Sequence, residues 1–384
     1  MVSGGNEYLG NSPYLKDRLY LNDGAGKFIR SATFPDLFEN KSVVKIADFD
    51  KDGDLDIFVG GRANSSLYGA LPTSYLLQND GKGNFSVVTN KIIPSLQHIG
   101  MVTDAVWTDV DNDGWPDLVV VGEWMAPTLF KNVKGRFTQV EFSNQIAALK
   151  GWWFSCKAVD VNGDGFQDIL LGNYGLNSKL TASKDYPLKM YVADIRGDKR
   201  PVQILAVAKE GRYFPFLGKE SLEKQLPYLN KEFLSYSKIA GKTVTEIFGD
   251  KLDTATLFEA STLASVILIN DGKGHFNISA LPTEMQWQPI FSFANADFNQ
   301  DGKMDLLAGG NFFGTMPFEG RYDALPIAMY TGDGKGVFKM TLPLPEPFNT
   351  IKGEVRSIQP IKLAGGKRGM LVAFNNGPLK LFAY

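Results

Sequence analysis

Residues Asp48-Phe-Asp50-Lys-Asp52-Gly53-Asp-Leu-Asp56 place carboxylates at positions 1, 3, 5 and 9 of a nine-residue stretch, with glycine at position 6. Three later stretches repeat this spacing: Asp109–Asp117, Asp160–Asp168 and Asp297–Asp305. Alternate residues can direct their oxygens to one point while glycine makes the sharp turn, and Ca²⁺ accepts about six to eight such ligands in irregular geometry. A surface turn needs no carboxylate at fixed positions, so the repetition predicts about four Ca²⁺ sites.

The expected metal ligands are the side chains at positions 1, 3, 5 and 9 of the four loops: Asp48, Asp50, Asp52, Asp56, Asp109, Asp111, Asp113, Asp117, Asp160, Asn162, Asp164, Asp168, Asp297, Asn299, Asp301 and Asp305. Because Asn162 and Asn299 reduce the ligand charge, the first two loops are expected to bind Ca²⁺ more tightly than the last two.

An EF-hand is the first alternative to test for these loops. It requires Glu at position 12 and a helix on each side. Position 12 is apolar in all four loops: Val59, Val120, Leu171 and Ala308. The residues that follow each loop form a short apolar run ending in glycine, which is typical of a buried strand. The loops are therefore predicted to join strands.

A second signature alternates with the acidic loops. An apolar strand, a glycine-containing turn and an aromatic residue recur over residues 19–28, 76–85, 129–137, 267–276 and 329–338. Such turns favour tight hairpins because glycine adopts positive φ. One repeat is thus about four strands, which is typical of a propeller blade. We predict an all-β protein, a β-propeller of about seven four-stranded blades with the first incomplete, or of six if the N-terminal half-repeat completes the last blade.

Two parts of the chain depart from the repeat. Residues 194–202 keep acidic side chains only at positions 1 and 5, so this segment is expected to be a blade without an ordinary Ca²⁺ site. Leu222, Leu226 and Leu229 recur at helical spacing, which predicts a helical insertion within one blade near residues 219–262. The insertion either contributes to function or covers the edge of a blade. We expect residues 1–384 to form a single propeller domain, and the start in mid-repeat indicates a fragment of a longer protein.

Composition excludes several classes of protein. The net charge is −2, and no apolar run approaches the ~20 residues that span a bilayer, so no membrane span is predicted. Nucleic-acid binding is disfavoured because no compact basic run with interleaved aromatic residues occurs. The single cysteine, Cys156, excludes an internal disulfide and is expected to be a buried structural thiol.

The acidic loops alternating with Asn-Asp-Gly-x-Gly-x-Phe hairpins resemble the FG-GAP/VCBS repeat family, which includes the integrin α-chain propeller. Leu-Gly-Asn-Tyr-Gly-Leu-Asn at 171–177 and Gly-Asn-Phe-Phe at 310–313 are similar to bacterial proteins related to cartilage acidic protein, which often carry an ASPIC/UnbV domain. The resemblance implies a Ca²⁺-bound propeller in an extracellular, periplasmic or cell-surface setting, exported by a signal outside this chain. It implies no catalytic residues.

Loops after the second strand of each blade are expected to gather on one face and to form a partner surface. They supply aromatic, Asn and Arg side chains that suit a protein or glycan ligand: Tyr8, Arg62, Trp124, Tyr174, Asn177, Phe312, Phe313, Arg321 and Tyr322. Packing of the aromatic residues between blades is an equal alternative. The predicted function is a non-catalytic binding or scaffold module.

The alternative function is a Ca²⁺-stabilised polysaccharide lyase or hydrolase. Such an enzyme needs a carboxylate pair or a base in one cleft. Glu123, Glu319 and Asp323 are available acids, and the chain has only two histidines, His98 and His275. The sequence does not pair these groups, so no catalytic residue is assigned.

Overall fold

The computed structural model describes residues 1, 8, 12–140 and 142–383. The N-terminal half-repeat that bears on the blade count falls largely outside these residues. Within them the chain folds into antiparallel sheets joined by short turns and short helices. The all-β prediction is confirmed, and no helix of the described chain is long and apolar enough to cross a membrane.

Three sheets come from the first part of the chain. The first pairs β1 (Tyr20–Asn22) with β2 (Phe28–Arg30). The second runs in the order β3 (Asn40–Ala47), β4 (Asp56–Ala63), β5 (Tyr75–Asn79) and β6 (Phe85–Val87). The third runs β7 (Met101–Thr108), β8 (Asp117–Met125), β9 (Thr128–Val133) and β10 (Arg136–Val140), and β11 (Gly151–Trp152) also pairs with β8. Helices α1 (Thr89–Ile92) and α2 (Asn144–Ala147) follow β6 and β10.

Three further sheets continue this pattern. One contains β12 (Ser155–Val159), β13 (Asp168–Gly172), β18 (Val266–Asn270) and β19 (Phe276–Ala280). The next contains β20 (Ser292–Ala296), β21 (Asp305–Gly309), β22 (Ile327–Gly332) and β23 (Phe338–Met340). The last contains β24 (Val355–Lys362), β25 (Arg368–Phe374) and β26 (Lys380–Ala383). All five hairpins of the second sequence signature are present.

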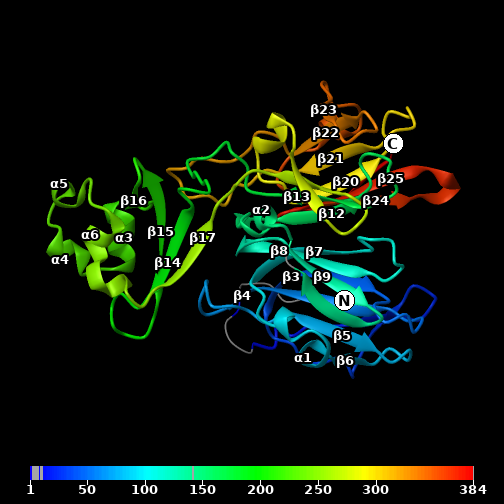
Figure 1. Cartoon of the computed structure of the whole chain (residues 1–384), viewed down its shortest axis with the longest axis horizontal. Helices are drawn as coiled ribbons and strands as arrows, with labels where there is room; N and C mark the ends of the chain where they lie inside the picture. The colour runs from blue at the N-terminus through cyan, green and yellow to red at the C-terminus, as the bar shows by residue number, and fades with distance from the viewer. Residues whose placement is uncertain (2–7, 9–11, 141, 384) are drawn as a thin grey trace.

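The first strands of five sheets contact one another in the order β3, β7, β12, β20 and β24. Figure 1 shows the sheets of the N-terminal half below those of the C-terminal half, with β7 and β12 where the two groups meet. This arrangement resembles the radial succession of a propeller. No sheet closes on itself, so the predicted count of seven or six blades stays a prediction.

The largest departure from the repeat is an insertion between β13 and β18, two strands that are hydrogen-bonded neighbours. It contains a sheet of β14 (Leu188–Ala193), β15 (Val202–Lys209), β16 (Arg212–Pro215) and β17 (Thr256–Ala260). Helices α3 (Lys219–Gln225), α4 (Leu229–Glu232), α5 (Tyr236–Ile239) and α6 (Val244–Phe248) follow β16. The whole unit projects to the left in Figure 1.

This unit revises two expectations. Residues 194–202 do not belong to a separate blade, because they form the turn from β14 to β15 inside the insertion. The segment 219–262 is helical only to residue 252, and residues 256–260 form β17, which pairs with β14. The sequence did not reveal that this sheet buries one face against the helices: Ile204 and Ala206 pack in one cluster with Leu222 and Phe248.

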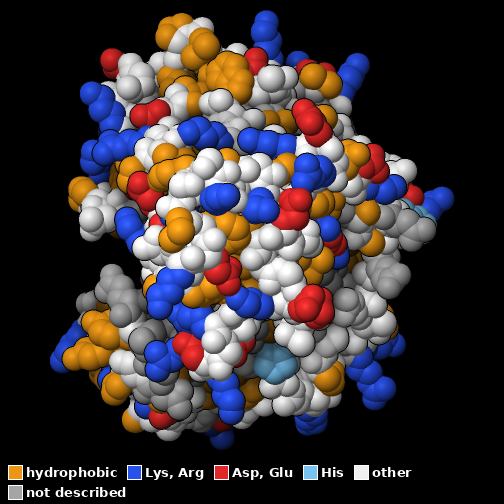
Figure 2. Space-filling view, turned by 90° about the vertical axis from the view of Figure 1, so that its left-hand side faces the viewer, with side chains coloured by type: hydrophobic (Ala, Val, Ile, Leu, Met, Phe, Trp, Pro, Cys, Tyr) orange, Lys and Arg blue, Asp and Glu red, His pale blue; other side chains and the backbone are white. Residues whose placement is uncertain are grey.

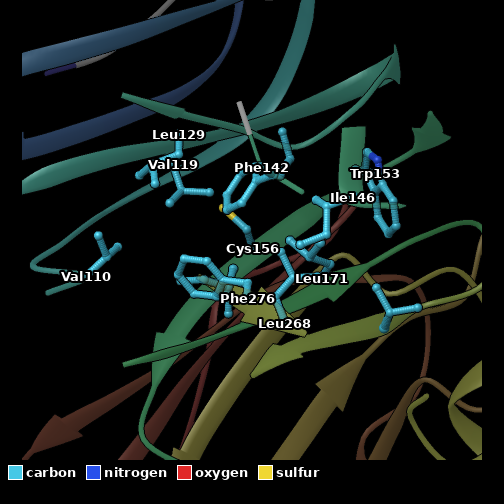
Figure 3. Close-up of a cluster of buried hydrophobic side chains, with 13 residues drawn as sticks. Val110, Val119, Leu129, Phe142, Ile146, Trp153, Cys156, Leu171, Leu268 and Phe276 are labelled. Carbon is cyan, nitrogen blue, oxygen red and sulfur yellow. The ribbon is translucent and has the colours of Figure 1, made fainter. Parts of the chain in front are cut away.

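Apolar side chains fill the space between successive sheets. Figure 3 shows one such cluster, in which Val119 and Leu129 of the third sheet face Cys156, Leu171 and Leu268 of the next sheet. Burial of such side chains contributes about 25 cal/mol per Å² of apolar surface. Cys156 is buried, as predicted, and burial raises the pKa of its thiol well above the usual value.

Candidate metal centres

Each of the four acidic loops joins the first strand of a sheet to the second. At position 1 of every loop the carboxylate accepts the backbone N–H of the glycine at position 6, with N–O distances of 3.1 Å for Asp48, 2.6 Å for Asp109, 2.9 Å for Asp160 and 2.9 Å for Asp297. The four glycines have φ between 82° and 97°, a conformation that side chains with Cβ rarely adopt. The shared spacing therefore produces a shared loop conformation.

The aspartate at position 9 is fully buried in all four loops. Asp56 accepts the backbone N–H of Phe49 at 3.2 Å and of Asn79 at 2.9 Å. Asp117 accepts those of Val110 at 3.0 Å and Asn132 at 2.7 Å. Each carboxylate thus ties its own loop to the third strand of its sheet.

The last two loops repeat this bridge. Asp168 accepts the N–H groups of Val161 and Asn270 at 3.0 and 2.8 Å. Asp305 accepts those of Phe298 and Gly332 at 2.9 and 3.1 Å. Position 9 therefore has a structural role besides any role as a metal ligand. The loop spacing alone does not reveal this role, although both the aspartates and their backbone donors lie in the repeated signatures.

Asparagines of the hairpin signature connect neighbouring sheets. The Asn132 amide donates to the Phe49 carbonyl of the preceding loop at 2.8 Å. The Asn270 amide donates to the Val110 carbonyl at 2.7 Å in the same way. Both asparagines are buried. In the sequence both asparagines read only as turn residues, and their recurrence directly before the turn is the signal that could have identified this contact.

The first loop brings three carboxylates together. One oxygen each of Asp48, Asp50 and Asp56 lies within 4.8 Å of the others. Asp48 Oδ1 and Asp50 Oδ1 are buried and accept no hydrogen bond from any residue that the structure describes. Gln78 on β5 donates its amide to the other oxygen of Asp50. Because a buried anionic oxygen without a donor is costly, these residues fit a cation.

The second loop forms the same cluster with a different neighbour. One oxygen each of Asp109, Asp111 and Asp117 lies within 4.8 Å of the others. Lys131 on β9 extends into the loop, with Nζ 2.6 Å from Asp111, 3.0 Å from Asp113 and 3.3 Å from Asp117. Burial of Lys131 lowers its pKa, but the hydrogen bonds to Asp111 and Asp113 outweigh this effect and raise the pKa overall. The ammonium therefore supplies positive charge that the first loop lacks.

The third and fourth loops satisfy part of their own charge through asparagine. The Asn162 amide donates to Asp164 at 2.9 Å, and the Asn299 amide donates to Asp301 at 3.2 Å. Among the described residues, three-carboxylate clusters with this close spacing occur at the first two loops. The predicted oxygen ligands are present in all four loops, but their surroundings differ.

Burial changes the acidity of the position-9 aspartates. It raises the pKa of Asp56 to about 6, against the opposing effect of the N–H groups of Asn79 and Phe49. It also raises the pKa of Asp117 to about 6, although the bonds from Asn132, Val110 and Lys131 act in the opposite direction. A bound divalent cation would favour the ionised form of both groups.

The structure separates the expected partner residues into two groups. Trp124, Tyr174 and Tyr322 are 6, 6 and 8% exposed and pack together with Trp152 and Leu188. Their burial matches the packing alternative. Phe312 is half-buried against Tyr174 and Tyr322 in the same cluster.

The remaining expected partner residues reach the surface to different extents. Asn177 and Arg321 are exposed, and the Arg321 guanidinium lies over the half-buried Phe313 ring at 5.1 Å. Tyr8 is 40% exposed and stacks on Tyr14. Arg62 forms an ion pair with Glu123. On the face shown in Figure 2, basic side chains are interspersed with acidic and apolar ones.

Two of the three acids considered for catalysis, Glu123 and Glu319, have structural partners. The buried Glu123 carboxylate accepts hydrogen bonds from Arg62 and, at 2.7 Å, from the Tyr68 hydroxyl. Glu319 accepts the Tyr322 hydroxyl at 2.9 Å, and Asp323 is exposed.

Two solved structures show distant likenesses to this chain. The biofilm matrix protein Bap1 of V. cholerae is 10% identical, with 93% of this chain and 70% of that chain covered and a TM-score of 0.33. BBS1N in complex with ARL6DN is 10% identical, with 89% and 77% covered and a TM-score of 0.32. Scores this low support no argument about this chain.

Comparison with protein families is more informative. No curated protein matches the chain, so the finer resemblance to relatives of cartilage acidic protein stays a prediction. The model of the FG-GAP-like repeat matches residues 4–59, 66–120 and 109–171, which include the first three acidic loops. By these three matches the chain contains FG-GAP-like repeats within its first 171 residues.

Proposed function

We propose that this protein is a Ca²⁺-stabilised, propeller-like binding or scaffold module. The observation that carries the proposal is the first acidic loop, where Asp48 and Asp50 each bury a carboxylate oxygen that no described residue satisfies. Hard carboxylate and carbonyl oxygens in an irregular loop suit Ca²⁺ better than Mg²⁺, which demands near-octahedral geometry. The ion would neutralise the cluster and hold the turn between β3 and β4.

Several loops share this design, and their contacts support a common structural role. Lys51 of the first loop lies 4.8 Å from the Trp115 ring of the second loop. Asn112 of the second loop donates to the Gly165 carbonyl of the third at 3.2 Å. A cation in one loop would therefore also restrain its neighbours. We propose that the sheets form a propeller-like ring whose loops are rigidified by Ca²⁺.

The partner of this module is proposed to be a protein or a glycan. The exposed part of the expected partner surface contains Asn177 and Arg321, and beside Asn177 in sequence the apolar Leu176 is 57% exposed. Phe318, three residues before Arg321, is 46% exposed. Exposed apolar side chains next to amide and guanidinium groups are typical of recognition surfaces. An extracytoplasmic setting, where free Ca²⁺ is plentiful, would suit such a module.

A melting experiment tests the metal proposal. The wild-type protein should melt at a higher temperature with Ca²⁺ than in metal-free buffer, because at 100 Kd one site adds about 2.7 kcal/mol to the free energy of unfolding. Asp50→Asn should reduce this gain, since it removes charge beside the unsatisfied oxygens. Asp185→Asn is the matched control, because Asp185 is exposed outside the loops. Identical melting with and without Ca²⁺ would reject the proposal.

A further inference from the structure

A cavity of about 740 Å³ lies where the first strands of five sheets meet. Its walls include residues of β3, β7, β12, β20 and β24, together with Arg62 and Ala63 of β4. The charged residues of the lining are five basic and one acidic: Lys41, Lys45, Arg62, Lys157, Arg356 and Asp104. This excess of cations contrasts with the acidic loops and has no role in the metal proposal.

Four of the five cations have a carboxylate partner. Lys45 pairs with Asp104 at 2.9 Å. The other three pair with acids that do not line the cavity: Lys41 with Asp17 at 3.3 Å, Arg356 with Glu354 at 2.7 Å and Arg62 with Glu123. These pairs fix the cationic side chains in the wall and reduce the cost of burying them.

Lys157 is the exception. Its ammonium forms no ion pair or hydrogen bond with any residue in the described part of the chain. Lys157 lines the same cavity as Lys45 and Asp104. Burial first and the charge of Lys45 second lower the pKa of Lys157, while Asp104 acts in the opposite direction. Asp104 also accepts the N–H groups of Ala105 and Cys156, both at 2.9 Å. Asp104, the one carboxylate of the cavity lining, thus pairs with Lys45 and not with Lys157.

We propose that this cavity binds a small organic oxyanion, with Lys157 as the principal cationic contact and Lys45 beside it. An anion at this point would neutralise the positive charge of Lys157, which Asp104 does not balance. Ion pairs inside a partly enclosed cavity are stronger than on the surface, because water screens them less. The site is distinct from the acidic loops, which lie at the ends of the same strands.

Aromatic rings in the wall indicate that the ligand carries more than a bare ion. Phe154 and Phe291 line the cavity and stack with ring centroids 4.7 Å apart. The Arg356 guanidinium lies over Phe291 at 4.0 Å. An apolar wall next to ammonium groups suits a ligand with an organic body and a carboxylate, sulfate or phosphate group.

Isothermal titration calorimetry with two probes tests the proposal. Sodium sulfate and sodium glucuronate are titrated separately into the whole chain with Ca²⁺ present and ionic strength held constant with chloride. We expect saturable binding of at least one probe. Binding of glucuronate alone would identify a carboxylate ligand, and binding of sulfate would extend the site to sulfate and phosphate groups.

Variants locate the binding. Lys157→Met should weaken it about tenfold, which corresponds to about 1.4 kcal/mol, and Lys157→Arg should retain it. Lys91→Met is the control, because Lys91 is exposed on α1 outside the cavity. Unchanged melting of each variant in the absence of the probe would show that the fold is intact. No saturable heat with either probe, or equal weakening by Lys91→Met, would overturn the proposal without affecting the metal proposal.

Discussion

The first and second acidic loops have the same four aspartates at the same spacing, yet they balance their charge differently. In the first loop, Asp48 and Asp50 keep buried oxygens without a donor among the described residues. In the second loop, the Lys131 ammonium contacts three of the aspartates. The residue that makes this difference lies on the third strand of the sheet, outside the loop motif.

The equivalent position precedes the turn of each hairpin. The residue at this position is Gln78 on β5, Lys131 on β9, Ile269 on β18 and Thr331 on β22. If Ca²⁺ affinity is ranked by the loop residues alone, the first two loops rank equally. The comparison shows that a side chain outside the loop can supply positive charge to its aspartates. We therefore infer that the first loop is the stronger candidate for Ca²⁺.

The largest expected effect tests what the two loops share. Asp56→Ala and Asp117→Ala should each lower the free energy of unfolding by about 2–6 kcal/mol, because each leaves two buried N–H groups without an acceptor at about 1–3 kcal/mol apiece. Urea unfolding in metal-free buffer measures the loss. Asp52→Ala, at an exposed position of the first loop, is the control. Losses no greater than the control would show that the position-9 bridge does not stabilise the fold.

The next effect tests how the loops differ. Lys131→Met should lower the free energy of unfolding by about 1–3 kcal/mol in metal-free buffer, because three aspartates lose a charged donor. With Ca²⁺ this loss should be recovered, and calorimetric titration should find one more Ca²⁺ per chain. The reciprocal change Gln78→Lys should remove one Ca²⁺ from the first loop. If both variants bound the same number of Ca²⁺ ions per chain as the wild-type protein, the residue at this position would not explain the difference between the two loops.

A smaller effect concerns the contact between the two sheets that carry these loops. Asn132→Ala removes the amide that donates to the Phe49 carbonyl of the first loop and to the Pro116 carbonyl of the second. We expect a loss of about 1–3 kcal/mol in urea unfolding, since the carbonyls become unsatisfied. Asn230→Ala, in helix α4 of the insertion and exposed, is the control. If the free energy of unfolding fell no more than in the control, Asn132 would not stabilise the contact between the sheets.

The smallest effect is the pH dependence. The pKa of Asp56 and Asp117 is about 6 in the folded protein, against an ordinary value of 3.8. The folded state therefore binds these protons more tightly than the unfolded state, and stability falls as the pH rises between these values. Metal-free protein should be more stable at pH 5 than at pH 7. Ca²⁺ should reverse this order, because it requires the ionised carboxylates.

Asp56→Asn and Asp117→Asn should each reduce the pH dependence of the metal-free protein. Unfolding in urea at the two pH values, in buffers stripped of metal, provides the measurement. A metal-free wild-type protein that loses stability on acidification from pH 7 to pH 5 would contradict the assignment of raised pKa values to these groups.

The repeats made much of this fold predictable. The loop spacing and the hairpin turns are local signals, and they located β4, β8, β13 and β21 after the loops and the five hairpins. Helix α6 likewise begins at a local signal, the capping box of Thr243 and Glu246. Local chemistry determines these features, so the sequence carries them directly.

Features that depend on contacts distant in sequence could not be predicted. The burial of Trp124 and Tyr174 results from packing against β14 of the insertion, which the repeat pattern does not place. The approach of Lys131 to the second loop depends on strand register. The cationic cavity depends on five first strands meeting, although its lysines are ordinary in sequence. The number of blades likewise depends on how the sheets close.

The insertion between β13 and β18 has a consequence for the folding pathway. Ile169 must pair with Leu268 across a chain segment that forms a sheet and four helices of its own. The entropy of closing a loop grows only with the logarithm of its length, by about 0.6 kcal/mol per doubling, so the long detour is tolerated at equilibrium. Contacts so distant in sequence form slowly. We therefore expect this sheet to assemble last, after the inserted unit has collapsed and brought its two ends together.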